Sequence, residues 1–496
     1  MRFLLENEKL IPERLSDKSD AKRITDFETC YPQTLNPIFN YSSELQLLLN
    51  GKQLLLDEIP LSLKVIHQHY LNGYLQYRKC ISKTKDGYDC IRCGNSDQKL
   101  FASFDCARCK NECAYCRKCI NMGRMSECTV LVSWTGPSTI VEIPEEPLAW
   151  EGTLSPGQQR ASTELIKAVQ ANVQLLIWAV CGAGKTETLF EGIETALQSG
   201  KKVCLATPRT DVVIELAPRI KSAFPGVDVI ALYGGSEDRS KTAPITLATT
   251  HQLLRYYKAF DMIIIDEVDA FPYSAEPMLQ YAVNQAKKDV SSTIYLTATP
   301  NQTWKNEIAA CKRKAVTIPA RYHRHALPVP ELIWCGNWEE ILKKNKLPRN
   351  VMAWIKEHLE IEKQAFLFVP RITYLERIVS ILQSLDHRIE GVHAEDPDRK
   401  DKVARFRSGE TPILVTTTIL ERGVTVPNID VAVLGAEDKI FTESALVQIS
   451  GRVGRSAQFS TGEILFFHYG KTREMIKAKK HIEIMNKEAI QNGFID

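Results

Sequence analysis

The chain has 496 residues, which is more than one hydrophobic core organises, so its length predicts about three domains. Hydrophobic residues make up 44% and charged residues 25%, and the net charge of +3 gives no overall basic character that would by itself indicate a nucleic-acid partner. No apolar run approaches the roughly 18 residues of a transmembrane helix, and Glu6, Glu8 and Lys9 interrupt any signal-peptide core. We therefore expect a cytoplasmic protein without a transmembrane segment, with peripheral attachment to a membrane through a partner left open.

The first segment, residues 1–75, contains no recognisable motif and is predicted to hold helices around 43–56 and 60–75. Its role is left open. Residues 76–134 follow as a cysteine-rich module, because nine of the 14 cysteines lie between Cys80 and Cys128. In a cytosolic chain such clustering favours metal binding over disulfides.

The spacing within this module indicates a zinc site. Two Cys-x-x-Cys pairs, Cys90 with Cys93 and Cys116 with Cys119, are separated by 22 residues and can present four thiolates to Zn²⁺. A four-thiolate site has no open position, so the zinc is predicted to be structural. The module also contains further cysteines, namely Cys106, Cys109, Cys113 and Cys128. These could bind a second zinc or offer alternative ligands for the first, and the sequence leaves both open.

The module is locally basic. Residues 72–124 carry 11 Lys or Arg against 5 Asp or Glu. Aromatic residues are interspersed with them: Tyr74, Tyr77, Tyr88, Phe101, Phe104 and Tyr115. Because basic groups neutralise phosphates and aromatic rings stack on unpaired bases, one hypothesis is a grip on single-stranded nucleic acid. A solvated basic face and a protein-docking surface are the alternatives.

Two α/β domains are predicted after a Pro- and Glu-rich linker at 135–150. The first, residues 150–325, has apolar strand-like runs at 173–180, 203–206, 245–249, 262–265 and 293–297. The second, residues 326–496, has such runs at 365–369, 413–417, 431–434 and 463–467. Continuous apolar strands separated by helical stretches indicate parallel sheets covered on both faces. A basic cluster near the junction could line a nucleic-acid path or be a solvated connector: Lys312, Arg313, Lys314, Arg321 and Arg324.

A phosphate loop follows the first of these strands. Residues 179–186 read Ala-Val-Cys-Gly-Ala-Gly-Lys-Thr and lead into a helical stretch, which is the context such a loop requires. The segment Gly182, Ala183 and Gly184 lets backbone N–H groups face the phosphates of ATP. Lys185 is predicted to reach the β- and γ-phosphates, and the Thr186 hydroxyl to coordinate Mg²⁺.

Two further features complete the predicted nucleotide site. Asp266 ends an apolar strand and is placed to hold Mg²⁺, and Glu267 is the candidate for orienting the attacking water. Asp269 is a candidate for contact with the Thr297–Thr299 turn. Gln158, before the first strand, could read the adenine edge with its amide, whereas helix capping by Ser155 is the competing interpretation.

Four of these strings together resemble superfamily-two helicases and translocases over roughly residues 150–460: the phosphate loop, Asp-Glu-Val-Asp at 266–269, Thr-Ala-Thr at 297–299 and Gln-Ile-Ser-Gly-Arg-Val-Gly-Arg at 448–455. The resemblance implies two tandem RecA-like domains. It implies that Arg452 and Arg455 approach the γ-phosphate, where a guanidinium can stabilise charge on the transferred phosphoryl group. It also implies nucleic-acid contacts from the segments 207–209, 249–251 and 417–423, which contain Arg209, Thr250 and Thr418.

A closer resemblance is carried by longer strings at 176–187, 206–213, 265–272 and 418–425, together with the preceding Cys-x-x-Cys module. They are similar to the ComFA family of late-competence DNA-uptake ATPases. This implies a single-stranded-DNA-dependent ATPase that helps draw transforming DNA through a membrane channel. It also implies a phosphoribosyltransferase-like competence protein as a partner, and zinc on Cys90, Cys93, Cys116 and Cys119.

Two other functions stay open. One is an RNA or duplex-DNA helicase or remodeller, and the other is an ATP-gated DNA clamp that does not translocate. The sequence does not determine polarity, duplex unwinding or oligomeric state, and an oligomer is possible.

Overall fold

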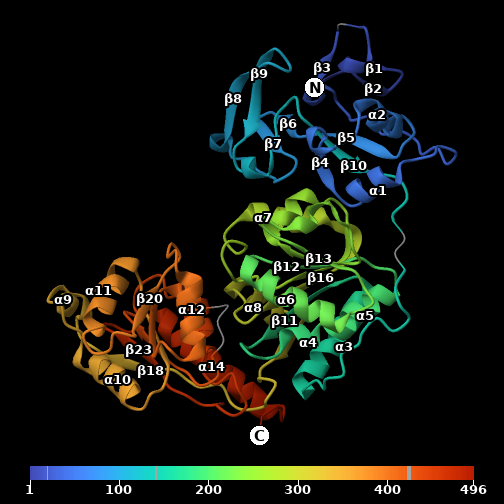
Figure 1. Cartoon of the computed structure of the whole chain (residues 1–496). Helices are drawn as coiled ribbons and strands as arrows, with labels where there is room; N and C mark the ends of the chain where they lie inside the picture. The colour runs from blue at the N-terminus through green and yellow to red at the C-terminus, as the bar shows by residue number, and fades with distance from the viewer. Residues whose placement is uncertain (19, 140–141, 422–425, 496) are drawn as a thin grey trace. The chain divides into compact units, whose positions relative to one another are not determined.

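The computed structural model describes residues 1–18, 20–139, 142–421 and 426–495 (Figure 1). They form two compact units, each described by itself. The first comprises Met1–Glu151, Ile166–Gln174 and Glu191–Tyr295, and the second comprises Gly152–Leu165, Leu175–Phe190 and Leu296–Asp496. Among the described residues, none of the helices combines the length and apolar character needed to cross a bilayer.

The N-terminal elements form two small antiparallel sheets and two helices. The bounds are β1 (Arg2–Glu6), β2 (Lys9–Pro12), β3 (Lys22–Arg23), α1 (Ser43–Leu49), β4 (Gln53–Leu55), α2 (Leu63–Leu71), β5 (Leu75–Lys79) and β10 (Val130–Trp134). The sheet orders are β2-β1-β3 and β4-β10-β5. Apolar side chains from both sheets and both helices share one core, which includes Phe3, Leu45, Tyr70, Tyr77 and Val132.

The helix predicted over 43–56 is wrong beyond Leu49. The Ser42 side chain caps α1 at its start by accepting from the Leu45 N–H, but the chain turns at Gly51, whose φ is 74°. A Cβ at Gly51 would lie 2.7 Å from the Cβ of Ala259, so only glycine permits this approach. Residues Gln53–Leu55 then pair with β10 as a strand, because tertiary pairing outweighs local helix propensity.

Two antiparallel hairpins carry the cysteines between β5 and β10. They are β6 (Ile81–Thr84) with β7 (Gly87–Cys90), and β8 (Phe101–Cys106) with β9 (Asn111–Cys116). Figure 1 shows them as separate ribbons in the N-terminal part of the first unit.

The first parallel sheet has seven strands in the order β13-β14-β12-β15-β16-β11-β17. Its strands are β11 (Gln174–Ala179), β12 (Val203–Thr207), β13 (Val229–Leu232), β14 (Ile245–Thr249), β15 (Phe260–Ile265), β16 (Lys287–Thr297) and β17 (Ala315–Ile318). The helices that accompany it are α3 (Pro156–Ala171), α4 (Lys185–Thr188), α5 (Phe190–Gln198), α6 (Thr210–Ala223), α7 (Pro277–Ala286) and α8 (Gln302–Ala309). The predicted strands are confirmed, whereas β13 and β17 were not foreseen.

The second parallel sheet has six strands in the order β18-β23-β22-β19-β21-β20. Its strands are β18 (Glu331–Trp334), β19 (Ala365–Phe368), β20 (Glu390–Val392), β21 (Ile413–Thr416), β22 (Asp430–Leu434) and β23 (Ile464–His468). Its helices are α9 (Trp338–Lys343), α10 (Arg349–Glu360), α11 (Ile372–Leu382), α12 (Arg399–Ser408), α13 (Glu443–Ser450) and α14 (Arg473–Gln491).

Helices cover both faces of this second sheet. Successive residues of a strand point to opposite faces, so each strand contributes to two cores. Phe366 and Phe368 of β19 pack in one core with residues of α12, α13 and α14. Ala365 and Leu367, which alternate with them, pack in the other core with residues of α9, α10 and α11. This arrangement explains why the strands read as continuous apolar runs.

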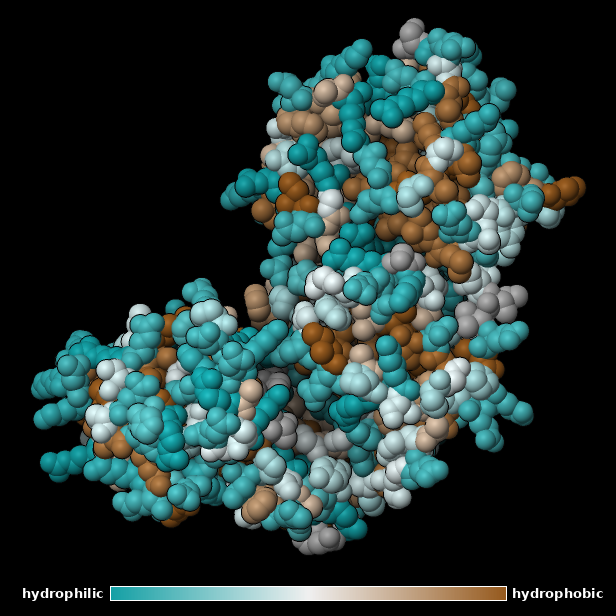
Figure 2. Space-filling model, viewed as in Figure 1, coloured by the Kyte–Doolittle hydropathy of each residue, from teal (hydrophilic) through white to brown (hydrophobic). Residues whose placement is uncertain are grey.

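The predicted fold class, two tandem RecA-like parallel-sheet domains preceded by a small cysteine-rich module, is confirmed. The four predicted segment boundaries stay predictions. The visible face of both units is largely hydrophilic, with hydrophobic side chains gathered over the N-terminal elements (Figure 2).

Candidate ATP site and zinc module

The phosphate loop lies between β11 and α4, as predicted. Gly182 and Gly184 adopt φ values of 81° and 71°, a left-handed conformation that glycine adopts without strain. Gly184 is the N-cap of α4, and Lys185 is the first residue of that helix. Thr186 follows and is almost completely buried. The loop thus directs backbone N–H groups and a helix N-terminus to one place, as anion binding requires.

Gln158 makes two hydrogen bonds with its side-chain amide. Its Nε2 donates to the Gly184 carbonyl oxygen at 3.0 Å, and its Oε1 accepts from the Ser155 N–H at 2.8 Å. The second bond is a helix-capping contact, so capping is present at this position. The first bond links the start of α3 to the phosphate loop, and adenine recognition by Gln158 stays a prediction.

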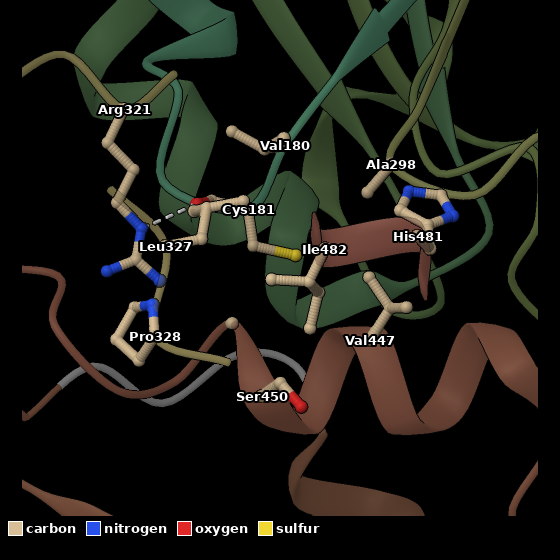
Figure 3. Close-up of a pocket in the computed structure, with 11 residues that line it drawn as sticks. Val180, Cys181, Ala298, Arg321, Leu327, Pro328, Val447, Ser450, His481 and Ile482 are labelled. Carbon is tan, nitrogen blue, oxygen red and sulfur yellow. Dashed lines mark hydrogen bonds between the residues drawn. The ribbon is translucent and has the colours of Figure 1, made fainter. Parts of the chain in front are cut away.

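Helix α13, which carries the last helicase-like string, contacts the phosphate loop within the second unit. The Cys181 thiol donates to Gln448 Oε1 at 3.0 Å. A Cβ at Gly451 would lie 2.4 Å from the Cβ of Cys181, so glycine is required for this approach. A pocket beside this contact is lined by Cys181, Val447 and Ser450 among others (Figure 3).

Arg321 is the main functional candidate that the sequence did not identify. The sequence left open whether its cluster lines a nucleic-acid path or is a solvated connector, and the connector alternative is wrong for Arg321, because it is 1% exposed. Its Nε donates to the Cys181 carbonyl at 3.2 Å (Figure 3), and its Nη1 donates to the Gly454 carbonyl. Burial and the positive charge of Arg455 lower the pKa of Arg321 to about 10. The signal that could have found it is its position just after β17, the strand that pairs with β11 in parallel.

The two predicted arginines lie at the end of α13. Arg452 is buried, and its Nε donates to the Glu421 carbonyl at 2.9 Å. Arg455 is partly exposed, and its Nε donates to the Gly451 carbonyl at 2.8 Å. Arg321 and Arg455 therefore place two positive charges near the phosphate loop, which suits a polyanionic ligand.

The Thr297–Thr299 turn also meets α13. The Thr299 and Ser444 hydroxyl oxygens lie 2.7 Å apart in a hydrogen bond, and the Trp178 indole N–H donates to the Ala298 carbonyl at 2.9 Å. The turn therefore joins the strand before the phosphate loop to the helix that carries Gln448. Contact between the turn and Asp269 stays a prediction.

Glu443, the first residue of α13, forms ion pairs with two other helices. Its Oε1 lies 2.8 Å from Lys305 Nζ of α8 and 3.1 Å from His481 Nδ1 of α14. The hydrogen bond with His481, followed by that with Lys305, lowers the pKa of Glu443 from 4.5 to about 2, although burial opposes the shift.

This pKa gives a testable pH dependence. Because the folded-state pKa lies below the unfolded value, the stabilisation is complete above about pH 4.5 and is lost as the pH falls towards about 2. We expect Glu443→Gln to lower the free energy of unfolding by about 1–3 kcal/mol at pH 7. Urea unfolding of both proteins from pH 7 to pH 3 measures the difference, which must shrink as the pH falls. A difference that is independent of pH would contradict the assignment.

Asp266 and Glu267 lie in the first unit, directly after β15. Asp266 Oδ1 accepts from the Glu267 N–H at 2.8 Å. Glu267 has a φ of 57°, which is uncommon for a residue with a side chain and costs conformational energy. Strain of this kind is concentrated at functional sites. The residues therefore suit the predicted roles, which stay predictions.

The three predicted nucleic-acid contacts differ in exposure. Arg209 precedes α6, is partly exposed and forms an ion pair with Asp211 at 3.1 Å. Thr250 begins the short 3-10 helix η7 (Thr250–Arg255) and is fully buried, so its side chain is not accessible here. Thr418 begins another 3-10 helix, η8 (Thr418–Leu420), and is partly exposed. Residues 422 and 423 of the predicted contact segment 417–423 lie outside the described residues.

The four predicted zinc ligands lie together and are buried. Cys90, Cys93, Cys116 and Cys119 bring their sulfurs within 4.8 Å of one another. The Cys90–Cys119 and Cys93–Cys116 sulfur distances are 3.8 and 3.7 Å. Tetrahedral zinc with bonds of about 2.3 Å separates its sulfurs by about 3.8 Å, so the set fits this ion.

Side chains around this site support the ligands. Arg92 is buried, and its Nη2 donates to Cys119 Sγ at 3.2 Å and to the Cys119 carbonyl at 2.8 Å. Such outer hydrogen bonds orient metal ligands and partly compensate thiolate charge. Gly94, at a φ of 67°, donates its N–H to the Cys90 carbonyl at 2.8 Å and closes the knuckle.

The cysteine module packs against α7 and against Tyr257, which follows η7, within the first unit. The Tyr281 hydroxyl of α7 donates to the Ile91 carbonyl at 3.0 Å, and Lys118 pairs with Glu276 at 2.6 Å. Arg78 stacks 3.6 Å from the ring centroid of Tyr257. The turn at Cys90–Gly94, which is the first zinc knuckle, is therefore joined directly to α7, a helix that accompanies the first parallel sheet.

These contacts restrict the predicted single-strand grip. Tyr74 and Tyr77 are buried, so the prediction that they stack on bases was wrong. Arg124 covers Phe104 and Tyr115, with its guanidinium carbon 4.8 and 5.4 Å from the two ring centroids. The remaining exposed basic residues of the module include Lys85, Lys99, Lys110 and Arg117.

Comparison with known proteins identifies the family. The chain matches the Competence protein ComFA N-terminal domain over residues 36–133, the Type III restriction enzyme res subunit family over 151–302 and the Helicase conserved C-terminal domain over 344–457. It is 50% identical to competence protein ComFA of Bacillus subtilis (strain 168), over 91% of this chain and 96% of that protein. The chain belongs to the ComFA family.

A second relative agrees. Competence protein ComFA of Streptococcus pneumoniae (strain ATCC BAA-255 / R6) is 39% identical over 76% of this chain and 86% of that protein. Among solved structures, S. cerevisiae Dbp5 bound to RNA and ADP BeF3 is similar at 14% identity, with a TM-score of 0.49, over 67% of this chain and 88% of that one.

Membership of the ComFA family, together with the two helicase-type domain matches, makes this chain a competence-related helicase-like protein of superfamily two and a nucleic-acid-dependent ATPase. Helicase domains of this type use ATP with a divalent metal ion. The cysteine clusters of this ComFA family member are suited to zinc.

Proposed function

We propose that this chain is an ATP-driven motor that moves along single-stranded DNA and helps import transforming DNA during natural competence. The observation that carries the proposal is the contact of the phosphate loop with α13, through Cys181 and Gln448. A helix that touches the phosphate loop and leads directly into Arg452 and Arg455 can respond to the state of the nucleotide. Coupling of this kind is what a motor needs.

In this proposal the phosphate-loop residues hold ATP: Gly182, Ala183, Gly184, Lys185 and Thr186. Thr186 and Asp266 would hold Mg²⁺, which neutralises phosphate charge when bound. Glu267 orients the attacking water, and Arg452 and Arg455 stabilise charge on the transferred phosphoryl group. Gln158 positions the loop through Gly184 and recognises adenine.

Nucleic acid is proposed to contact both parallel-sheet domains. Arg209 neutralises a backbone phosphate from the first, and Thr418 contacts the backbone from the second. Thr250 takes part after a local rearrangement that exposes its hydroxyl. A structural zinc on Cys90, Cys93, Cys116 and Cys119 holds the module that packs on α7, and the module assists DNA binding.

We further propose that the protein works in the cytoplasm, at the inner face of the membrane, beside a DNA-uptake channel. A phosphoribosyltransferase-like competence protein is the proposed soluble partner. Two relatives of this chain are competence proteins, which supports the competence role.

Steady-state ATP hydrolysis tests the proposed substrate. It is measured without polymer and with single-stranded DNA, duplex DNA or RNA, with Lys185→Ala as the blank. We expect single-stranded DNA to activate turnover most strongly, because the proposed contacts are to the backbone of one strand. Stronger activation by RNA or duplex DNA would favour a helicase or remodeller instead. Tight nucleotide-dependent DNA binding with slow turnover, and no displacement of a protein block from the DNA, would indicate a non-translocating clamp.

A further inference from the structure

We propose that Cys106, Cys109, Cys113 and Cys128 hold a second, structural zinc ion. The four sulfurs lie within 4.8 Å of one another, and all four residues are buried. The Cys106 and Cys128 sulfurs are 3.5 Å apart. This is close to the roughly 3.8 Å edge of a tetrahedral zinc–thiolate site and too far for a disulfide bond of about 2.05 Å.

The turn between β8 and β9 repeats the backbone geometry of the first zinc knuckle. The Lys110 N–H donates to the Cys106 carbonyl at 2.7 Å, as the Gly94 N–H donates to the Cys90 carbonyl at 2.8 Å. Lys110 has a φ of 56°, against 67° for Gly94. Lysine adopts this left-handed conformation at a cost, so something else must stabilise the turn. Metal coordination by Cys106 and Cys109 supplies that stabilisation.

The strand geometry of β9 keeps the two clusters apart. Cys113 and Cys116 form a Cys-x-x-Cys pair by spacing, which would suggest a shared metal. They lie on a β-strand, however, and residues separated by three positions on a strand point to opposite faces. Cys113 therefore joins one cluster and Cys116 the other, and each cluster has four ligands of its own.

The hairpin has little apolar material to hold it together. Its buried cluster consists of the four cysteines, with Phe104 packed against them, among the described residues. So small a cluster cannot supply the burial that a stable core needs, and small domains of this kind depend on metals or disulfides. A zinc–thiolate site accounts for an ordered hairpin at this position.

The second site also joins the start of the chain to the module. The N-terminal amine of Met1 donates to the Cys128 carbonyl at 2.5 Å. The neighbouring Glu127 carboxylate is buried, accepts from the Ala114 N–H at 2.8 Å and pairs with Arg23 at 3.1 Å. The first site instead contacts α7 through the Ile91 carbonyl. The two zinc ions thus stabilise different contacts. The first stabilises the contact with α7, and the second stabilises the attachment of the N-terminal sheet β2-β1-β3.

A third group of possible ligands does not qualify. His358, Asp430 and Glu463 also lie together, but Lys363 Nζ is 2.6 Å from Asp430 Oδ2. The Glu463 side chain accepts from the Trp354 indole N–H. The Asp430 carboxylate is thus paired with a lysine, and the Glu463 carboxylate accepts a hydrogen bond. We therefore propose metal only at the cysteine clusters.

The zinc content of the full-length protein tests the proposal. We expect native mass spectrometry to find two zinc ions per chain. Cys106→Ser with Cys109→Ser and Cys90→Ser with Cys93→Ser should each leave one, whereas the control Cys311→Ser, at an exposed cysteine, should keep two. One zinc in the unsubstituted protein, together with no loss in the Cys106/Cys109 variant, would overturn the proposal.

Two further measurements remain informative if a variant folds poorly. Mass spectrometry of the denatured, unreduced protein should show all four cysteines as thiols, and a Cys106–Cys128 disulfide would overturn the proposal. Cobalt substitution of the unsubstituted protein should give the tetrathiolate absorption of two sites per chain. In the Cys106/Cys109 variant, amide exchange should rise over β1–β3 and remain unchanged over α7. A rise over α7 alone would contradict the assignment of different contacts to the two ions.

Discussion

Lys185→Ala should abolish ATP hydrolysis while leaving most DNA binding intact. Lys185 begins α4 immediately after the left-handed Gly184, where the phosphate loop and the helix N-terminus meet. In a phosphate loop the lysine at this position reaches the β- and γ-phosphates, which is the role proposed for Lys185. Loss of a preorganised charge at a reacting group typically costs about 3 kcal/mol or more, which is roughly a 100-fold fall in turnover.

Steady-state and single-turnover assays with single-stranded DNA measure this loss, and fluorescence anisotropy measures DNA affinity in the same preparations. The matched control is Lys487→Ala, because Lys487 is an exposed lysine on α14. It should retain normal turnover. DNA-stimulated hydrolysis that survives in Lys185→Ala would remove Lys185 from the site. Asp266→Ala should reproduce the loss, because it removes the proposed magnesium ligand.

Cys90→Ser with Cys93→Ser should unfold the first zinc knuckle. Structural zinc supplies about 10 kcal/mol or more of apparent binding energy in small metal domains, which is comparable with the whole stability of a typical domain. Without the knuckle, the Tyr281 hydroxyl loses its acceptor at the Ile91 carbonyl. We expect one zinc fewer, rapid amide exchange over residues 87–95 and weaker binding of single-stranded DNA.

The ATP site provides an internal check on this variant. Hydrolysis without polymer should survive, because Cys90 and Cys93 are not among the residues proposed to hold ATP, magnesium or the attacking water. The control Cys311→Ser should behave as the unsubstituted protein. Unchanged DNA affinity in a demonstrably zinc-depleted preparation would refute the role of the module in DNA binding, and retention of all zinc would refute the ligand assignment.

Much of the proposed ATP site was predictable because its signals are local. A strand, a glycine-containing loop and a helix are consecutive in sequence, so the left-handed positions of Gly182 and Gly184 follow from the residues themselves. The continuous apolar runs likewise indicated buried parallel strands. Edge or short strands such as β13 and β20 were missed, because they carry a weaker pattern and depend on their neighbours for pairing.

Contacts between distant segments were not predictable. Arg321 reads as one more basic residue in a connector, yet the pairing of β17 with β11 places it beside Cys181. Tyr77 reads as an accessible aromatic ring, yet it completes the N-terminal core. Burial at these positions depends on segments more than 50 residues away, and one-dimensional patterns carry no information about them.

The cysteine module shows which properties follow from the sequence alone and which depend on the tertiary structure. The sequence by itself predicted a metal site made of thiolates, since residue type and Cys-x-x-Cys spacing decide the chemistry. It also determined the ATPase motifs and the family they resemble. Spacing and resemblance also gave the set Cys90, Cys93, Cys116 and Cys119, but only the tertiary structure decided that the other four cysteines form a cluster of their own. Cys113 and Cys116 are close in sequence, but the pleat of β9 directs them to opposite faces, so they join different clusters.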